Sequence, residues 1–225
     1  MDGNGRWAQK RFLNRVKGHE KGAETVRVIT RVCREFGIQI LTLYAFSTEN
    51  WQRPKSEIAA LMQLLKSFLC KEEAELNANH IRLSVIGQSH RLPADVRNVI
   101  EHTIAATSAN RGLLLNLALS YGGRAELTDM ARAVASKAAA GELSVEDIDE
   151  SVVAAHLYTR DLPDPDILIR TGGEMRISNF MLWQLAYAEF FITPTLWPDF
   201  SRDEFIGIIQ AYQQRNRRFG KLDNA

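Results

Sequence analysis

The chain has 225 residues, and its 28 lysines and arginines nearly balance 27 aspartates and glutamates, so the formal net charge at pH 7 is +1. This balance provides no long-range field to attract nucleic acid, so we expect no nucleic-acid partner and only local anion sites. The two cysteines lack the CxxC spacing of a zinc or redox site, which is typical of a reducing compartment and predicts a cytoplasmic protein. No apolar run approaches the roughly 20 residues that span a bilayer, and no signal-peptide pattern follows Met1.

Five strongly apolar runs of strand length alternate with helical patterns. The runs lie at residues 38–45, 81–86, 113–119, 167–169 and 189–193. Their nearly continuous apolarity is typical of parallel strands covered on both faces. Helices are predicted at about residues 18–36, 56–79, 93–108, 123–140, 144–157 and 201–218, the fifth from a capping pattern at Ser144 and Asp147. We therefore expect an α/β fold with an open, mainly parallel sheet flanked by helices, in a single domain over residues 1–225.

The loops after the strands are expected to hold the chemistry, because ligands of open α/β sheets bind at the carboxyl edge. The opening stretch Gly3-Asn4-Gly5-Arg6 offers bare backbone N–H groups and a guanidinium that suit a phosphate. Arg15 and His19 follow, where they could face the same anion. The stretch is neither a P-loop nor a dinucleotide fingerprint, so an ordinary glycine turn and a surface histidine remain the alternatives.

A second candidate anion site is the stretch RTGGEMRIS, from Arg170 to Ser178. Two arginines and a hydroxyl after an apolar strand form a plausible diphosphate clamp, because the guanidinium fork pairs bidentately with phosphate oxygens. A solvated loop is the alternative. The abrupt change from the apolar strand to Arg170 favours a functional site.

Two carboxylates are candidate metal ligands. Asp2 borders the glycine turn, and Glu189 stands at an apolar strand, where an unpaired carboxylate is costly. Mg²⁺ typically takes one or two carboxylates and completes its shell with phosphate oxygens and water, so the pair suits a metal–diphosphate substrate. A buried salt bridge is the competing account of Glu189.

The predicted helix at 56–79 carries one broad apolar stripe. It comprises Ile58, Leu61, Met62, Leu65, Phe68 and Leu69. Such a stripe fits a plain core, and it fits equally the wall of a tunnel for a long hydrocarbon.

Seven segments, spread over nearly the whole chain, together resemble the undecaprenyl diphosphate synthase family, the cis-prenyltransferases. They are MDGNGRWA (1–8), GHEKGAE (18–24), YAFSTENWQRPKSE (44–57), LNLALSYGGR (115–124), ILIRTGGEMRISNFMLWQLAYAEFF (167–191), LWPDF (196–200) and RRFG (217–220). The DDxxD motif of trans-type prenyl synthases is not present. In this family a buried strand precedes the aspartate and glycine loop, so the resemblance implies that the first strand is truncated here to its tip at Met1.

The resemblance implies an Mg²⁺-dependent enzyme that elongates farnesyl diphosphate by repeated cis condensation with isopentenyl diphosphate. The product would be an undecaprenyl-type lipid carrier precursor for cell-wall synthesis, grown in a hydrophobic tunnel with Leu113 and Leu119 as candidates for its floor. A non-catalytic partner subunit of a heteromeric enzyme is the rival interpretation. The presence of Asp2, Asn50 and Glu189 argues against that rival.

The resemblance also assigns roles to individual residues. By this analogy the allylic diphosphate is held by Gly3, Asn4, Gly5, Arg6, Arg15 and His19, with Trp7 close by. The isopentenyl diphosphate is held by Arg170, Arg176, Ile177 and Ser178. The metal ligands are Asp2 and Glu189, and the catalytic residues are Asp2 and Asn50. The residues that position the substrate and close a loop over it are Phe46, Ser47, Thr48, Glu49, Trp51 and Arg53.

An amide is a feeble base, so we interpret Asn50 as orienting a diphosphate oxygen or a water that takes the proton. A C-terminal Arg-x-Gly, here Arg218 and Gly220, would reach the diphosphate site of the neighbouring subunit in a homodimer. Peripheral membrane contact for product release is a further expectation.

Overall fold

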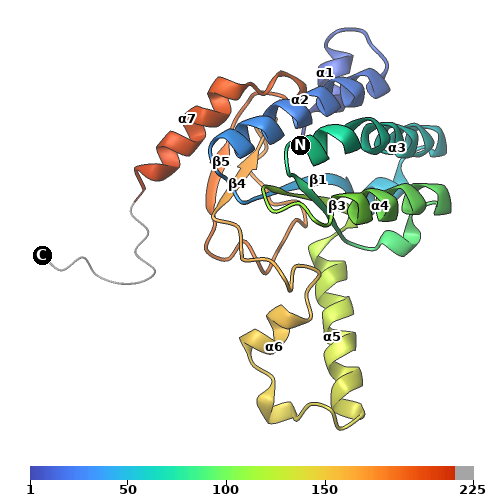
Figure 1. Cartoon of the computed structure of the whole chain (residues 1–225), viewed down its shortest axis with the longest axis vertical. Coiled ribbons are helices and arrows are strands. Elements are labelled where there is room, and N and C mark those ends of the chain that lie inside the picture. Colours follow the sequence, from blue (N-terminus) through green and yellow to red (C-terminus); the bar gives the residue numbers. More distant parts are fainter. Residues whose placement is uncertain (216–225) are drawn as a thin grey trace, which may run out of the picture.

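A computed structural model of the chain describes residues 1–215 (Figure 1). Strands β1 (Ile40–Ser47), β3 (Leu114–Tyr121) and β2 (Arg82–Ile86) form a parallel sheet in the order β1-β3-β2. Strands β4 (Ile167–Arg170) and β5 (Glu189–Ile192) form a second parallel pair. The predicted α/β fold with parallel strands flanked by helices is confirmed, although hydrogen bonds group the strands into two ladders.

The apolar sequence of β3 accounts for its central position in the sheet. All eight of its residues are buried, and its apolar side chains contact the core on both faces. Its one amide side chain, Asn116, donates to the hydroxyl of Thr42 on β1 at 3.2 Å. A register shift in β1 between Tyr44 and Phe46 breaks the regular pairing near the carboxyl end of that strand. Phe46 is buried and packs edge-on against Trp51, with ring centroids 4.9 Å apart.

Helices α2 (Arg15–Glu35), α3 (Lys55–Ala78) and α4 (Ala94–Thr107) lie side by side over the three-stranded sheet, and α7 (Arg202–Gln213) packs beside α2 (Figure 1). Short 3-10 turns precede three of these helices: η1 (Thr48–Gln52) precedes α3, η2 (Ser89–Arg91) precedes α4, and η4 (Trp197–Asp199) precedes α7. Within residues 1–215, no helix combines the length and the apolarity needed to cross a membrane.

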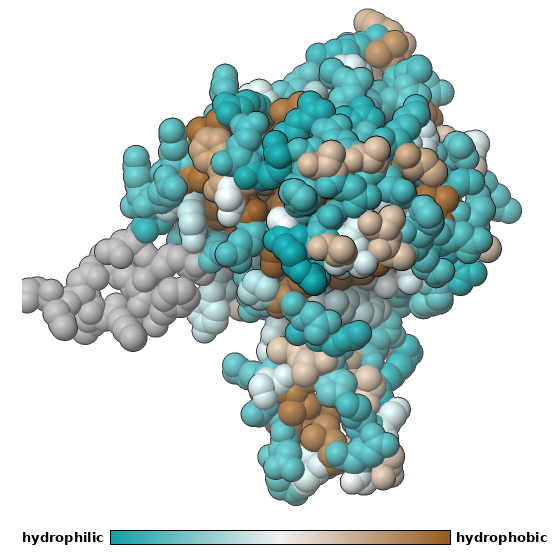
Figure 2. Space-filling view, viewed as in Figure 1, coloured by the Kyte–Doolittle hydropathy of each residue, from teal (hydrophilic) through white to brown (hydrophobic). Residues whose placement is uncertain are grey.

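Helix α5 (Gly123–Ala139) and helix α6 (Glu150–Ala155) form an arm that projects from the body, and Figure 2 shows apolar side chains gathered on this arm below a mostly hydrophilic surface. The continuous helix predicted at 144–157 is wrong. The segment divides into a 3-10 turn, η3 (Val145–Asp147), and the six-residue α6. The effective N-cap is Asp149, whose carboxylate accepts from the Val152 N–H at 2.9 Å.

The glycine stretch at the start of the chain leads into a short helix, α1 (Asn4–Gln9), instead of forming only the turn that the sequence suggested. Gly3 caps it with a φ of 101°, a conformation that side chains disfavour. Helix α1 lies directly on α2 because α2 presents glycines to it. A Cβ on Gly18 would lie 2.0 Å from the Asn4 carbonyl oxygen, and one on Gly22 would lie 2.2 Å from the Asn4 side-chain oxygen. The segment GHEKG therefore positions the opening loop.

A cavity of about 1210 Å³ lies between the two strand ladders and the helices above them. Strand β1 lies at an edge of its sheet, and every residue from 38 to 47 lines this cavity. Residues 162–171, which include β4, line the cavity as well. Leu117 and Leu119 of β3 belong to the wall, whereas Leu113 lies outside it in the core, so the expectation of Leu113 as a tunnel floor is not met.

Candidate functional site

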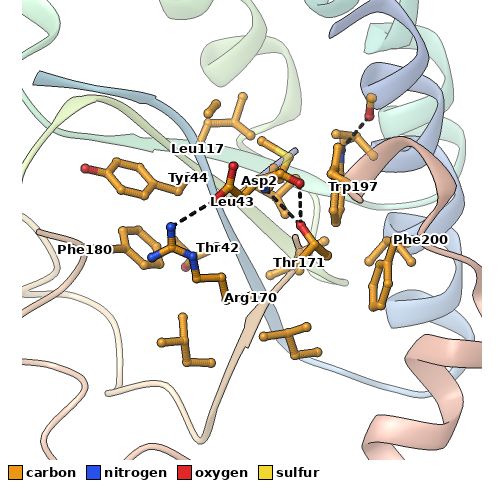
Figure 3. Close-up of a pocket in the computed structure, with 18 of the residues that line it drawn as sticks. Asp2, Thr42, Leu43, Tyr44, Leu117, Arg170, Thr171, Phe180, Trp197 and Phe200 are labelled. Atoms are coloured by element: carbon orange, nitrogen blue, oxygen red, sulfur yellow. Dashed lines mark hydrogen bonds and ion pairs between the residues drawn. The ribbon is translucent and has the colours of Figure 1, made fainter. Parts of the chain in front are cut away.

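The polar end of the cavity is built where β1 and β4 end (Figure 3). Asp2 is fixed there by its backbone. Its N–H donates to the Thr171 hydroxyl at 2.9 Å, and the same hydroxyl donates to the Asp2 carbonyl at 2.9 Å. The Trp197 N–H donates to that carbonyl at 2.9 Å as well. These bonds hold the Asp2 carboxylate beside the last residue of β4.

Arginines and carboxylates alternate along this end of the cavity. The Asp2 carboxylate accepts from Arg170 at 2.9 Å and lies 3.4 Å from a terminal nitrogen of Arg6. The Glu174 carboxylate contacts Arg6 at 3.3 Å and Arg176 at 2.6 Å. Three guanidinium groups are thus linked by two carboxylates, and the chain Arg170, Asp2, Arg6, Glu174, Arg176 carries a net charge of +1.

These contacts set the charge state of Asp2. Burial raises the pKa of its carboxyl, but the hydrogen bond from Arg170 and the charge of Arg6 outweigh burial, so the pKa lies below its ordinary value. Asp2 is therefore ionised at neutral pH. A carboxylate held between two arginines can exchange those partners for a cation when an anion takes over the guanidinium groups.

The loop after β4 adds a hydroxyl to the same site. Arg170 donates to the Ser178 hydroxyl at 2.8 Å and to the Arg176 carbonyl. Ser178 and Asn179 both have positive φ, 53° and 63°, which turns the loop back towards β1. The Asn179 amide donates to the Glu49 carboxylate at 2.7 Å. This bond joins the loop after β4 to the loop after β1.

A second group of charges lies across the site on α2 and α3. Arg15 and Arg53 contact opposite oxygens of the Glu57 carboxylate, at 3.4 Å and 3.1 Å. His19 lines the cavity near them, and its buried Nε2 has no hydrogen-bond partner in residues 1–215. Burial and then the charge of Arg53 lower the pKa of His19 to about 4, so its ring is neutral at pH 7.

The orientation of Asn50 follows from one hydrogen bond. Its side-chain oxygen accepts the Ser47 backbone N–H at 3.1 Å. The amide NH₂ is therefore the end that can face a ligand, and Asn50 lines the cavity. Its NH₂ group can therefore donate to an oxygen of a ligand in the cavity, and the role of Asn50 in orienting an oxygen stays a prediction.

The rest of the cavity is lined mainly by apolar side chains. Helix α3 contributes Leu61, Leu64, Leu65 and Phe68, and Trp197 and Phe200 stand on the wall opposite Tyr44 and Phe180 (Figure 3). The Tyr44 and Phe180 rings stack with centroids 4.4 Å apart. One cavity thus combines a guanidinium-rich end with apolar walls.

Most predicted site residues meet at this cavity. Its wall includes Asp2, Gly3, Asn4, Gly5, Arg6, Arg15, His19, Phe46, Ser47, Glu49, Asn50, Arg53, Arg170, Arg176, Ile177 and Ser178. Four predicted residues in the described part of the chain lie outside the wall, namely Trp7, Trp51, Thr48 and Glu189. Trp7 turns away and donates to Asp199 at 2.7 Å, Trp51 donates to the Ser120 hydroxyl at 2.9 Å, and Thr48 lies near Gly122. Arg218 lies outside the described residues.

The two predicted metal ligands do not meet within the chain. Glu189 pairs with Ile167 at the start of the β4–β5 ladder, whereas Arg170, which holds Asp2, pairs with Ile192 at its end. Three residues of strand, about 10 Å, separate the pairs, and an odd offset places their side chains on opposite faces. Glu189 instead lies 3.9 Å from Arg215. No cluster of three or more potential ligands occurs in the described part of the chain, so an Mg²⁺ ion here would complete its shell with water or with oxygens of a substrate.

Four residues of the site were missed by sequence reasoning. Thr171 holds Asp2, Glu57 and Glu174 join pairs of arginines, and Asn179 links the two loops. Only Glu57 left a sequence signal, since it stands four residues after Arg53 at the start of a helix.

Comparisons with known proteins agree with this geometry. Residues 1–220 match the sequence profile of the undecaprenyl diphosphate synthase family. An isoprenyl transferase of Geobacter sulfurreducens is 53% identical over 98% of this chain and 90% of its own length, and one of Bacillus subtilis is 50% identical over 99% and 85%. The crystal structure of lavandulyl diphosphate synthase from Lavandula x intermedia with dimethylallyl diphosphate superposes with a TM-score of 0.95, at 37% identity, over 98% of this chain and 95% of that one. The chain therefore belongs to the undecaprenyl diphosphate synthase family, whose members are prenyltransferases.

Proposed function

We propose that this prenyltransferase elongates an allylic diphosphate, farnesyl diphosphate, by successive cis condensations with isopentenyl diphosphate. The proposal rests on one observation: five arginines line the same cavity as a long set of apolar side chains. This combination suits the substrate and the product, because both consist of a diphosphate joined to a hydrocarbon. The proposed product is a long-chain, undecaprenyl-type diphosphate that serves as a lipid carrier precursor for cell-wall synthesis.

The arginines would act on the bond that breaks. Cleavage of the allylic C–O bond leaves a delocalised cation and a diphosphate that gains negative charge. Guanidinium groups already fixed in place stabilise this developing charge without reorganising at the moment of reaction. Arg170 is the best fixed of them, since Asp2 and Ser178 hold it and its side chain is 15% exposed. The loss of one such contact is expected to cost about 3 kcal/mol, or roughly a hundredfold in rate.

The new C–C bond forms between the allylic carbon and the double bond of isopentenyl diphosphate, and the condensation then releases diphosphate and one proton. No carboxylate or neutral histidine is assigned as the base. Asn50 donates through its NH₂ group to a diphosphate oxygen or water, and that oxygen accepts the proton. The stacked Tyr44 and Phe180 rings give this side of the cavity an aromatic wall.

Mg²⁺ is the proposed cofactor. Asp2 would hold it, and the ion would supply charge stabilisation to the leaving diphosphate. The fit rests on the donor set: one ionised carboxylate stands between two arginines that an incoming diphosphate can engage. Glu189 is too far along the ladder to share that ion within one chain, so a role for it requires a second subunit. A homodimer with Arg218 shared across subunits, a cytoplasmic location and peripheral membrane contact at product release complete the proposal.

The decisive experiment is mass spectrometry of the products formed from farnesyl and isopentenyl diphosphates with Mg²⁺. We expect a ladder of elongated diphosphates, and at least a hundredfold loss of turnover in Asp2→Ala while diphosphate binding largely survives. Full turnover by Asp2→Ala would refute the role of Asp2. A single short coupling product, or none, would refute chain elongation.

A further inference from the structure

Glu57 stands behind the cavity wall, where two arginines from different segments converge. Its side chain is 14% exposed and lies in the first turn of α3. One carboxylate oxygen is 3.4 Å from Nε of Arg15 on α2, and the other is 3.1 Å from Nη1 of Arg53, just before α3. Both arginines line the cavity, whereas Glu57 does not.

The Glu57 carboxylate reduces the electrostatic repulsion between Arg15 and Arg53. Two guanidinium groups held at one carboxylate repel each other, and the nearby His19 ring, which is neutral at pH 7, adds no further positive charge. Glu57 offsets this repulsion and leaves the trio with a net charge of +1. Each guanidinium carries five N–H donors, more than one carboxylate oxygen can accept, so donors remain for oxygens of a ligand in the cavity.

We propose that Glu57 is a positioning residue that holds Arg15 and Arg53 together as one clamp for a diphosphate group. This inference rests on the proposed function, since the clamp matters only if the cavity takes a diphosphate. Glu57 touches no substrate and acts through the two arginines.

The same pair of helices offers a matched control. Glu72, also on α3, accepts from Nε of Arg27 on α2 at 2.6 Å, and its side chain is 10% exposed. Neither Glu72 nor Arg27 lines the large cavity. Glu57→Gln and Glu72→Gln therefore each remove an ion pair between α2 and α3, one beside the site and one away from it, and Glu57→Gln removes the contact with Arg53 as well.

The sign of the effect tests the proposal. Removal of a negative charge from an anion site tightens anion binding if Coulomb forces alone act. If Glu57 orients the arginines, Glu57→Gln instead weakens binding, because the two guanidinium groups separate. We expect the dissociation constant of inorganic diphosphate, measured by calorimetry at fixed ionic strength, to rise about tenfold in Glu57→Gln, as for the loss of one charge-assisted contact. Glu72→Gln should remain within about twofold of the parent protein.

A double-mutant cycle gives a second measurement. If Glu57 acts through Arg15, Arg15→Gln will weaken diphosphate binding much less in the Glu57→Gln background than in the parent protein. Unchanged or tighter binding by folded Glu57→Gln, or strictly additive effects in the cycle, would overturn the inference. Failure of the parent protein itself to bind diphosphate would instead refute the proposed function.

Discussion

Replacement of Gly18 by alanine tests whether the contact between α1 and α2 positions the site. The added Cβ would lie 2.0 Å from the Asn4 carbonyl oxygen and 2.8 Å from its carbon, so α1 must move by roughly 1.5 Å to restore an ordinary contact. Alanine gains about 1 kcal/mol of helix propensity over glycine, whereas overpacking costs typically 1–3 kcal/mol. We expect the clash to win, with a net loss of about 1 kcal/mol of unfolding free energy.

Activity should fall more than stability. Helix α1 carries Asn4, Gly5 and Arg6 into the site, and a displacement of about 1 Å can cost roughly a hundredfold in rate. Urea unfolding and steady-state turnover measure the two effects. Gly207→Ala in α7 is the control, because a Cβ there meets nothing within 4 Å and should stabilise the protein by up to about 1 kcal/mol. If Gly18→Ala behaves like Gly207→Ala in both assays, the close contact does not position the site.

Three further changes probe other parts of the molecule. The pKa of His19 is about 4 in the folded chain and about 6.5 in the unfolded chain, so the unfolded chain binds more protons between these values and the free energy of unfolding falls by about 2 kcal/mol from pH 7 to pH 5. In a series of urea melts over this pH range, His19→Gln should reduce the fall in the free energy of unfolding. An unchanged slope would contradict the burial of the ring. Glu126→Ala should cost about 3 kcal/mol in the same melts, because the buried carboxylate accepts from Tyr121, Gln184 and the Tyr158 N–H, and a loss below about 1 kcal/mol would show that water replaces it. Leu65→Trp on α3 should shorten the products seen by mass spectrometry, and an unaltered product ladder would place the hydrocarbon elsewhere.

The sequence predicts those features that depend on local patterns. Strand β3 is recognisable because seven nearly continuous apolar residues must be covered on both faces, and α3 because its apolar stripe is long and regular. The glycine stretch could not be assigned to α1 from its own residues, because that helix depends on contacts with Gly18 and Gly22 of α2.

The site was predictable in composition but not in pairing. Arg170, Asp2 and Asn50 line one cavity, and Arg170 pairs with Asp2, whereas their roles stay predictions. The positions of Trp7 and Glu189 could not be predicted. Asp199, 192 residues along the chain, accepts a hydrogen bond from Trp7 and holds it away from the cavity, and the parallel register sets Glu189 at the other end of the β4–β5 ladder from Arg170. Contacts of this kind are decided by tertiary packing, which no periodicity in one chain encodes.

The two edge strands that face the cavity limit where a hydrocarbon can lie. Along the described chain β1 is bonded only to β3, and β4 only to β5, so each turns a row of backbone N–H and C=O groups towards the space between them. An alkyl chain laid along those rows would strip them of water and give no hydrogen bonds in return. Only water or an extended polypeptide can satisfy them. A hydrocarbon bound in this cavity is therefore expected to lie against Leu61, Leu65 and Phe68 of α3 and away from the two strand edges.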